Sequence, residues 1–367
     1  MSLSGAFVPT GFGSLAGWPD DDHASAFAAF RRGAVRALEK PYRTGSLGVD
    51  AAAFEPAFAE ARLLDRPGNA AARAFFERHF VPALITASDG GPGLVTGFYE
   101  PEVEASPVRT PRHGVPLLSR PDDLVDVDDA DRPAGFDPAL AFARRGADGL
   151  EPYFDRAAIE CGALDGRGLE IAWLESRVDA FFIHVQGAAR LVFPDGAVRR
   201  ITYAAKTGHP FTGPGGRLVA MGEIAPDRVS MQTIRRWLAD NPGRVDEILR
   251  QNRSYIFFRE APVDDPALGP VAAAKVPLTP GRSIAVDRLL HTFATPFFID
   301  APRVMGFSAA PFSRLMIAQD TGSAIVGPAR ADLFAGSGAQ AGEIAGVIRC
   351  PATFHALLPK TLTGGRL

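Results

Sequence analysis

The sequence has few cysteines and no clustered histidines, and both shortages exclude classes of site. Its 367 residues include two cysteines, Cys161 and Cys350, with no Cys-x-x-Cys spacing around either. Neither a zinc site nor a disulfide framework is indicated, although one bridge between the two cysteines stays open. The seven histidines form no His-x-His or His-Glu-x-x-His pattern, and no glycine-rich nucleotide loop is recognisable. We therefore expect no metal and no cofactor.

Long apolar runs and an excess of one charge are also lacking. No apolar stretch reaches the ~18 residues of a membrane helix, and the N-terminus "MSLSGAFVPTGFGSLAGWPDDD" has no basic segment followed by an apolar one. The 39 basic and 42 acidic residues give a net charge of −3, which excludes nucleic-acid binding by bulk charge. With 46% apolar residues, the chain is expected to be a soluble, monomeric protein of two domains.

Apolar periodicity predicts a helical beginning. The stretch "DHASAFAAFRRGAVRALEK" places Phe27, Phe30, Ala34 and Leu38 on one helix face. A further helix is expected after Asn69, which would cap its first turn.

From about Gly93 onwards, short β-type runs alternate with glycine and proline. They include "LEIAWLES", "SYIFFRE" and "AFFIHVQGAARLVFPDGAVRRITYA", the last with a Pro-Asp-Gly turn between two strands. One helical stretch, "SMQTIRRWLADNPGRVDEILRQN", is expected to split into two short helices at Asn241-Pro242. The chain is therefore predicted to be mainly β with a helical N-terminal part, an α+β protein.

Two proline-rich crossings suggest the domain boundaries. They lie near Glu102 to Arg109 and Glu260 to Pro270. We expect residues 1–103 and 260–367 to form one domain, with residues 104–259 inserted as a second, β-rich domain.

The stretch "IAQDTGSAIVGPARADLFAG" carries two carboxylates, Asp320 and Asp332. Asp-Thr-Gly-Ser-Ala is also the motif of aspartic peptidases, which need two aspartates that share a proton. A two-lobed peptidase of this length would carry the motif twice, and the chain has one copy. An aspartic peptidase therefore stays the alternative function. In a purely structural role, Asp320 would instead accept hydrogen bonds from the nearby backbone in a turn.

The pair of aspartates favours a different chemistry. "RLMIAQD" and "ADLFAG" are typical of buried strands, and the Gly/Pro loop between them would bring both carboxylates to one rim. Among Leu333, Phe334 and other apolar neighbours, Asp332 would be partly desolvated. Its acid form would be favoured, as general-acid catalysis near neutral pH requires.

Ordered motifs from Thr96 to the C-terminus make the resemblance specific. They are "TGFYEPEVEAS", "RVDAFFIHVQGAARLVF", "YAAKTGHPFTGPG", "SMQTIRRWL", "NRSYIFFRE", "VPLTPGRSIAVD" and "AQDTGSAIVGPARADLFAGSGAQAGEIAG". In these motifs the chain resembles the lytic murein transglycosylase A family, whose members cleave the glycan strands of peptidoglycan.

The resemblance implies both a fold and a reaction. The fold would be a six-stranded double-psi β-barrel domain with an inserted second β domain and a groove between them for the sugar chain. The reaction would cleave the β-1,4 bond between MurNAc and GlcNAc and leave a 1,6-anhydro-MurNAc end, without water as a reactant. The location implied is the periplasm, with the full-length precursor anchored to the outer membrane by a lipid.

The resemblance also implies the site residues. Asp332 would be the acid and base, and Asp320 would support it. The residues expected to bind substrate are Thr96, Gly97, Tyr99, Gln186, Gly187, Lys206, Gly322, Ser323 and Ala324.

Several nearby residues also have structural interpretations. Tyr99 is expected to stack on a sugar, with a half-buried strand position as the alternative. Glu100 is expected to be a solvated strand residue, His184 a histidine of the core or sheet face, and Asp179 an anchor of its strand. His209 would bind a muramic acid carboxylate or stabilise its loop. A non-catalytic, expansin-like wall-binding protein is a further alternative, but it would not need Asp332.

Overall fold

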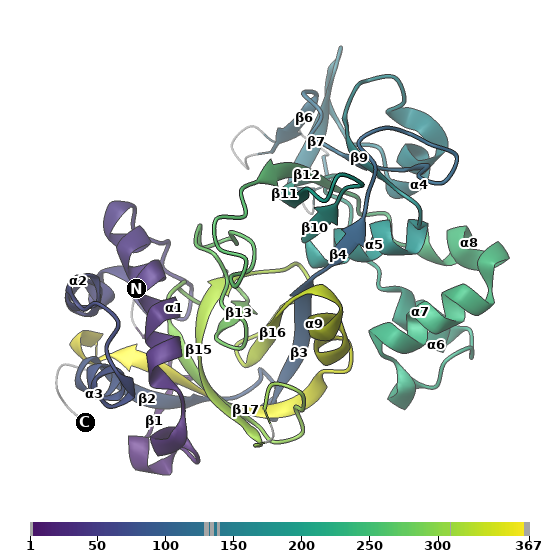
Figure 1. Ribbon diagram of the computed structural model, residues 1–367. Coiled ribbons are helices and arrows are strands. Elements are labelled where there is room, and N and C mark those ends of the chain that lie inside the picture. Colours follow the sequence, from purple (N-terminus) through teal and green to yellow (C-terminus); the bar gives the residue numbers. More distant parts are fainter. Residues whose placement is uncertain (1–2, 128–131, 133–135, 138–139, 309, 363–367) are drawn as a thin grey trace. The chain divides into compact units, whose positions relative to one another are not determined.

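The middle of the chain forms one compact unit, and the two ends together form another. The computed structural model describes residues 3–127, 132, 136–137, 140–308 and 310–362. The first unit comprises Met1–Tyr99 and Asp265–Leu367, and the second comprises Glu100–Asp264. In Figure 1 the first unit carries the purple and yellow ends of the colour scale, and the second the teal middle.

The first unit combines three N-terminal helices with an eight-stranded sheet. Its α-helices and strands are β1 (Val8–Pro9), α1 (His23–Glu39), α2 (Glu55–Leu63), α3 (Asn69–His79), β2 (Phe80–Ile85), β3 (Gly93–Glu100), β13 (Ser283–Val286), β14 (Pro296–Ala301), β15 (Phe312–Asp320), β16 (Arg330–Ser337), α9 (Gly338–Ala345) and β17 (Arg349–Pro359).

Six of these strands form a closed ring of pairings. The sheet order is β1-β2-β17-β14-β15-β13-β16-β3, and β17 also pairs with β3. The long strand β17 makes this closure possible because residues 349–352 pair with β3 while residues 353–359 pair with β14 and β2. Inside the ring, β13 runs parallel to β15 and antiparallel to β16.

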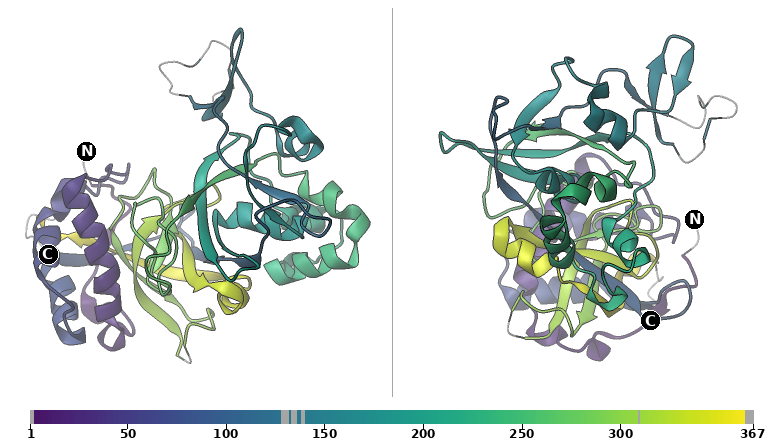
Figure 2. Two further views of the ribbon diagram at one scale, coloured as in Figure 1. Left: turned by 45° about the horizontal axis from the view of Figure 1, so that its top comes forward. Right: turned by 90° about the vertical axis from the view of Figure 1, so that its right-hand side faces the viewer.

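The N-terminal helices pack on this sheet, and α1 contacts β15. Both views in Figure 2 show the purple helices beside the strands of their own unit. Phe27, Phe30 and Ala34 are buried as predicted, but Leu38 is 37% exposed and Ala37 takes the buried position. Asn69 is the first residue of α3 and not its cap. Its side chain instead donates to the carbonyl of Asp21, which precedes α1, and accepts from the N–H of Ala24 in α1.

A buried ion pair joins the N-terminal segment to the sheet. Arg282 donates two hydrogen bonds to Asp21, at 2.9 and 2.8 Å, and Asp21 also accepts from the backbone N–H of Leu315 in β15. Because each charge has a geometrically matched partner, the pair can be buried without leaving an unpaired charge. The helical lead-in is thus part of the first unit.

Gly97 lets α9 approach β3 closely. A Cβ atom at this position would lie 2.8 Å from both the Cα and the carbonyl oxygen of Ala345, and 2.9 Å from Ile348 Cδ1. We expect Gly97→Ala to lower the free energy of unfolding by about 1–3 kcal/mol, because backbone atoms must move to make room. Urea denaturation measures the change.

Gly13→Ala is the matched control for Gly97→Ala. A Cβ atom at Gly13 would meet nothing within 4 Å, so the change should stay within about 0.5 kcal/mol. Equal effects of the two substitutions would contradict close packing at Gly97.

Within its described residues, the second unit contains three small sheets and a group of helices. Its α-helices and strands are β4 (Glu102–Glu104), β5 (Val115–Leu118), β6 (Leu124–Asp126), β7 (Phe142–Gly146), β8 (Gly149–Glu151), α4 (Arg156–Ala158), β9 (Glu170–Leu174), α5 (Arg177–Gln186), β10 (Ala188–Val192), β11 (Val198–Lys206), α6 (Pro214–Ala220), α7 (Met231–Asp240), α8 (Val245–Leu249) and β12 (Ile256–Ala261). The sheets have the orders β12-β11-β10-β4, β5-β9 and β6-β7-β8.

The hairpin and the split helix are confirmed in this unit. β10 and β11 pair antiparallel across the Pro-Asp-Gly turn, in which Gly196 has a φ of 81°. Helices α7 and α8 are separated at Asn241-Pro242. In both places a local signal decides the structure, because proline or a positive φ limits what the backbone can do.

The prediction of a strand over residues 180–186 is wrong, because this segment belongs to helix α5. Ser176 caps the helix by accepting from the N–H of Asp179, and Gly187 ends it with a φ of 77°. Its residues Phe181 and Phe182 join α6, α7 and α8 in a separate apolar cluster around Trp237. The second unit is therefore less purely β than expected.

Glu100 is not a solvated strand residue, as had been expected. Its side chain is fully buried and accepts from Arg200 at 2.6 and 3.1 Å and from Arg190 at 2.9 Å. It thereby joins the start of the second unit to β10 and β11, the strands that carry these arginines.

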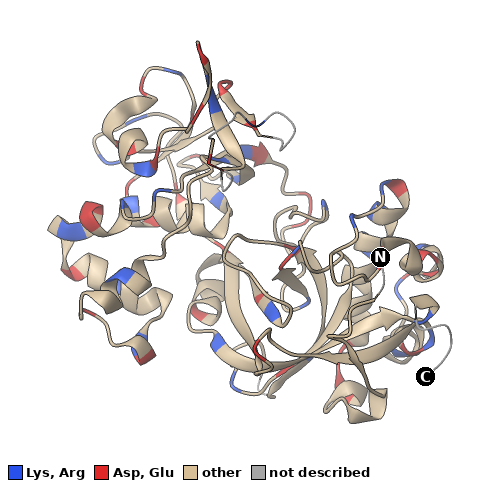
Figure 3. Ribbon diagram, turned by 180° about the vertical axis from the view of Figure 1, so that it is seen from behind, with Lys and Arg blue, Asp and Glu red and all other residues tan. Residues whose placement is uncertain are grey.

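Charged residues of both signs are interspersed over both units (Figure 3). In the part of the chain that the structure describes, no helix has both the length and the apolar character needed to cross a membrane.

Candidate functional site

The sheet places both aspartates beside the same residue. Ala285 in β13 pairs with Asp320 of β15 on one side and with Asp332 of β16 on the other. Directly paired residues in neighbouring strands project to the same face of a sheet. Asp320 and Asp332 therefore share one face, with their Cα atoms about 10 Å apart if each strand spacing is ~4.8 Å.

That face is distinct from the main core of the unit. On β16, Ala331 and Leu333 belong to the main core cluster, while Phe334 belongs to a smaller cluster with Phe98 and Ala285. Because strand side chains alternate, Asp332 projects to the side of Phe334. Leu333, expected as a neighbour of the carboxylate, lies on the opposite face.

Asp332 is half-buried and bonded to a residue from a distant strand. Thr96 of β3 hydrogen-bonds Asp332 Oδ1, and the Thr96 hydroxyl accepts from Arg330 Nη2 at 2.8 Å. Burial raises the pKa of Asp332, while the Thr96 hydrogen bond and the Arg330 charge oppose that rise. The environment therefore extends the pH range in which the protonated acid exists.

Asp320 has a separate set of partners. Its Oδ1 accepts from the N–H of Ala273 at 3.2 Å, and the N–H of Thr321 also hydrogen-bonds its carboxylate. Burial raises the pKa of Asp320 to about 6, the nearby Asp332 charge adds to the rise, and the two backbone donors oppose it. Asp320 and Asp332 thus use different donors and lie two strands apart, whereas a peptidase dyad requires carboxylates about 3 Å apart.

The loop between the aspartates is held at both ends. Thr321 donates its hydroxyl proton to the carbonyl of Val286 at 2.9 Å, and Gly327 N–H donates to Asp287 at 3.0 Å. His291 donates from Nε2 to the carbonyl of Pro328 at 2.8 Å. The proposed binding residues of this loop are Gly322, which is half-buried, and Ser323 and Ala324, which are exposed.

Tyr99 is buried, with 8% of its surface exposed. A Cβ atom added at Gly342 of α9 would lie 2.9 Å from the Tyr99 ring, so the ring packs against this helix. Tyr99 thus packs against α9, and Gly97 on the same strand also contacts this helix. This burial favours the structural interpretation of Tyr99, and its stacking on a sugar stays a prediction.

Gln186, Gly187 and Lys206 belong to the second unit. Gly187 is the residue that ends α5, and its N–H donates to the carbonyl of Ile183 at 2.8 Å. Gln186 is the last residue of α5, and Lys206 is the last residue of β11. Their proposed contacts with substrate stay predictions.

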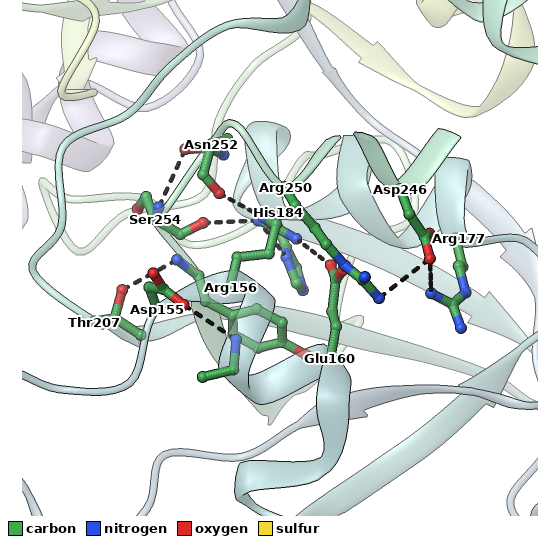
Figure 4. A network of polar contacts seen from close by, with 12 residues as sticks. Asp155, Arg156, Glu160, Arg177, His184, Thr207, Asp246, Arg250, Asn252 and Ser254 are labelled. Carbon is green, nitrogen blue, oxygen red and sulfur yellow. Dashed lines mark hydrogen bonds and ion pairs between the residues drawn. The ribbon is translucent and has the colours of Figure 1, made fainter. Parts of the chain in front are cut away.

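A buried arginine, missed at the sequence level, organises the region around His184 (Figure 4). Arg156 donates to the carbonyls of Asn252 and Ser254, at 3.0 and 2.8 Å, to Glu160 at 3.2 Å, and to His184 Nδ1 at 3.1 Å. Because arginine can only donate, His184 Nδ1 accepts and the ring is neutral. Burial lowers the pKa of His184 well below its usual value.

Two other polar residues of the second unit also have structural contacts. His209 is buried and donates to the carbonyl of Tyr153 at 2.8 Å, which supports a loop-stabilising role. Asp179 pairs with Arg235 of α7 at 2.6 Å, so it anchors one helix to another and not a strand.

Known proteins are similar to this chain in sequence and fold over nearly its whole length. Residues 94–259 match the MltA specific insert domain, and residues 282–358 match the 3D domain. The crystal structure of a membrane-bound lytic murein transglycosylase from Agrobacterium tumefaciens is 51% identical, with a TM-score of 0.92 over 98% of this chain and 99% of that one. The chain belongs to the lytic murein transglycosylase A family.

Other family members agree with this assignment. MltA from Neisseria gonorrhoeae is 32% identical, with a TM-score of 0.78 over 97% of this chain and 94% of that one. Membrane-bound lytic murein transglycosylase A from Vibrio cholerae is 35% identical over 197 residues, and this match spans about half of each protein, 52% of both. Asp320 lies within the 3D domain match together with Asp332, whereas Thr96 lies within the insert domain match.

Proposed function

We propose that this protein is a peptidoglycan lytic transglycosylase in which Asp332 is the only acid and base. The observation that carries the proposal is the environment of Asp332, which is half-buried, hydrogen-bonded to Thr96 and separated from Asp320 by a strand. Family membership supports the reaction class. We also infer that the closed ring of six strands is the double-psi β-barrel implied by the sequence.

The reaction needs one proton donor and no enzymic nucleophile. Asp332 protonates the leaving O4 of GlcNAc as the bond between C1 of MurNAc and O4 breaks. The C6 hydroxyl of the same MurNAc then attacks C1, and the Asp332 carboxylate takes the proton from O6. The new C1–O6 bond closes the 1,6-anhydro ring, and Asp332 returns to its acid form. Because the attack is intramolecular, positioning replaces the nucleophile.

Asp320 has a supporting part in this proposal. Its hydrogen bonds to Ala273 and Thr321 hold the start of the loop that carries Gly322, Ser323 and Ala324. The exposed Ser323 and Ala324 are proposed to contact the glycan strand. The protein is further proposed to act as a monomer in the periplasm, where its substrate lies, with a lipid anchor supplied by the precursor.

Digestion of purified peptidoglycan in ¹⁸O-labelled water tests the reaction class. Products with 1,6-anhydro-MurNAc ends and no label at C1 are expected, because the C6 hydroxyl and not water attacks C1. Mass spectrometry of the released muropeptides measures both features. Label at the new MurNAc C1 would show hydrolysis and refute the mechanism.

The same digestion separates the two alternatives. An expansin-like binding protein would release no muropeptides, and an aspartic peptidase would leave glycan strands intact. The separate hydrogen-bond donors of Asp320 and Asp332, and their place on two strands that have β13 between them, already disfavour the peptidase.

A further inference from the structure

Arg330 lies at the start of β16, two residues before Asp332 and therefore on the same strand face. Its Nη2 donates to the Thr96 hydroxyl at 2.8 Å, and its Nη1 donates to the carbonyl of Ala331. Arg330 is half-buried, and the two hydrogen bonds hold its guanidinium in one orientation. Arg330, Thr96 and Asp332 form a continuous chain of hydrogen bonds.

The direction of this chain follows from its donors. Arginine has no acceptor, so the Thr96 oxygen must accept from Arg330. The hydroxyl has a single proton, and Asp332 Oδ1 is its hydrogen-bond partner. With Asp332 charged, the Thr96 proton therefore points at Oδ1. In the neutral state it stays there when the acid proton is on Oδ2, whereas a proton on Oδ1 would have to be donated to Thr96 and would turn the hydroxyl proton away from this contact.

We propose that Arg330 is a positioning residue that acts through Thr96 to confine the catalytic proton of Asp332 to Oδ2. With Oδ1 occupied by the Thr96 proton, the acid proton has one remaining oxygen. Oδ2 then protonates the leaving O4 and later takes the proton from O6, so a single oxygen serves both steps. This inference rests on the proposed function, and it adds which oxygen reacts and what selects it.

Other charged groups face this part of the unit and affect the pKa of Asp332 or its neighbours. Asp320 approaches from β15, with Lys275 near it, and Arg349 of β17 lies beside Thr96 and near Arg330. Arg349 is exposed, so solvent screens its charge. Arg349→Met therefore serves as a control that removes a nearby charge but leaves the hydrogen-bond chain intact.

The test is the pH dependence of kcat for Thr96→Val, Thr96→Ser, Arg330→Met, the Thr96→Val/Arg330→Met double variant and Arg349→Met, with soluble glycan strands as substrate. Activity falls at high pH as the acid is lost. Thr96→Val removes a donor to the carboxylate, so the pKa of Asp332 should rise and the falling limb should move to higher pH. Thr96→Ser should restore the native profile.

The low-pH plateau of kcat isolates proton placement, because Asp332 is fully protonated there. Thr96→Val and Arg330→Met should each lower this plateau by about tenfold, the worth of roughly one hydrogen bond. The double variant should lose no more than Thr96→Val alone, because Arg330 acts through the hydroxyl. Arg349→Met should leave the plateau unchanged.

Two results would overturn the inference. One is a double variant whose losses multiply, which would mean that Arg330 acts independently of Thr96. The other is a Thr96→Val enzyme with a native plateau and limb. If Asp332→Asn is inactive, either result would refute only the inference about Arg330 and leave the proposed function standing. An active Asp332→Asn enzyme would instead refute the proposed function.

Discussion

Asp332→Asn is expected to reduce turnover of peptidoglycan by about 10²–10⁴-fold while the protein stays folded and still binds glycan strands. Asparagine keeps the shape of the side chain and an oxygen that can accept from Thr96, so the local packing should survive. It cannot donate and then accept the catalytic proton. Release of anhydro-muropeptides measures turnover, and sedimentation with insoluble peptidoglycan measures binding.

Asp320→Asn is the matched control on the same sheet face. The asparagine side chain would keep an oxygen that can accept from the N–H of Ala273, so we expect a smaller loss than for Asp332→Asn. The assignment of the acid would be wrong if Asp332→Asn kept more than a few per cent of activity while Asp320→Asn abolished it. Thermal unfolding of both variants confirms that neither result comes from misfolding.

Glu100→Ala is expected to destabilise the second unit by about 3–5 kcal/mol. Glu100 is fully buried, and Arg200, which donates two hydrogen bonds to it, is 3% exposed. Removing the carboxylate leaves the buried guanidinium without its paired negative charge. Urea denaturation followed by tryptophan fluorescence reports on this unit through Trp173 and Trp237.

The control is Glu260 of β12, the partner of Arg199, which precedes Arg200 in β11. Arg199 pairs with Glu260 at 3.4 Å, and both side chains are about half exposed, at 49% and 55%. Glu260→Ala should therefore cost less than about 1 kcal/mol, because solvent screens the pair. Similar costs for the two substitutions would mean that the buried triad of Glu100, Arg190 and Arg200 contributes no more than a surface ion pair.

The errors in the sequence prediction have two causes. Residues 180–186 are a short apolar run, which periodicity alone cannot assign to helix or strand. Ser176 three residues before Asp179, and Gly187 at the end, were the signals that a helix begins and ends there. Leu38 and Glu100 were misplaced because burial depends on what packs against a residue, and that partner is distant in sequence.

Arg330 could have been noticed from the sequence, because strand alternation puts it on the same face as Asp332. Its partner could not have been, since Thr96 is 234 residues away along the chain. The same holds for Arg156, whose partners Asn252 and Ser254 lie 96 and 98 residues further on.

By itself, the sequence determined the features that depend on neighbouring residues: the hairpin at Pro194 to Gly196, the helix break at Asn241-Pro242 and the motif that carries both aspartates and marks the family. Only the tertiary structure decided that Asp320 and Asp332 flank Ala285 and that Thr96 reaches Asp332. The reason is that local signals act through backbone conformation. Strand pairing and burial instead depend on contacts between segments that are distant along the chain, and these form only when the whole unit folds.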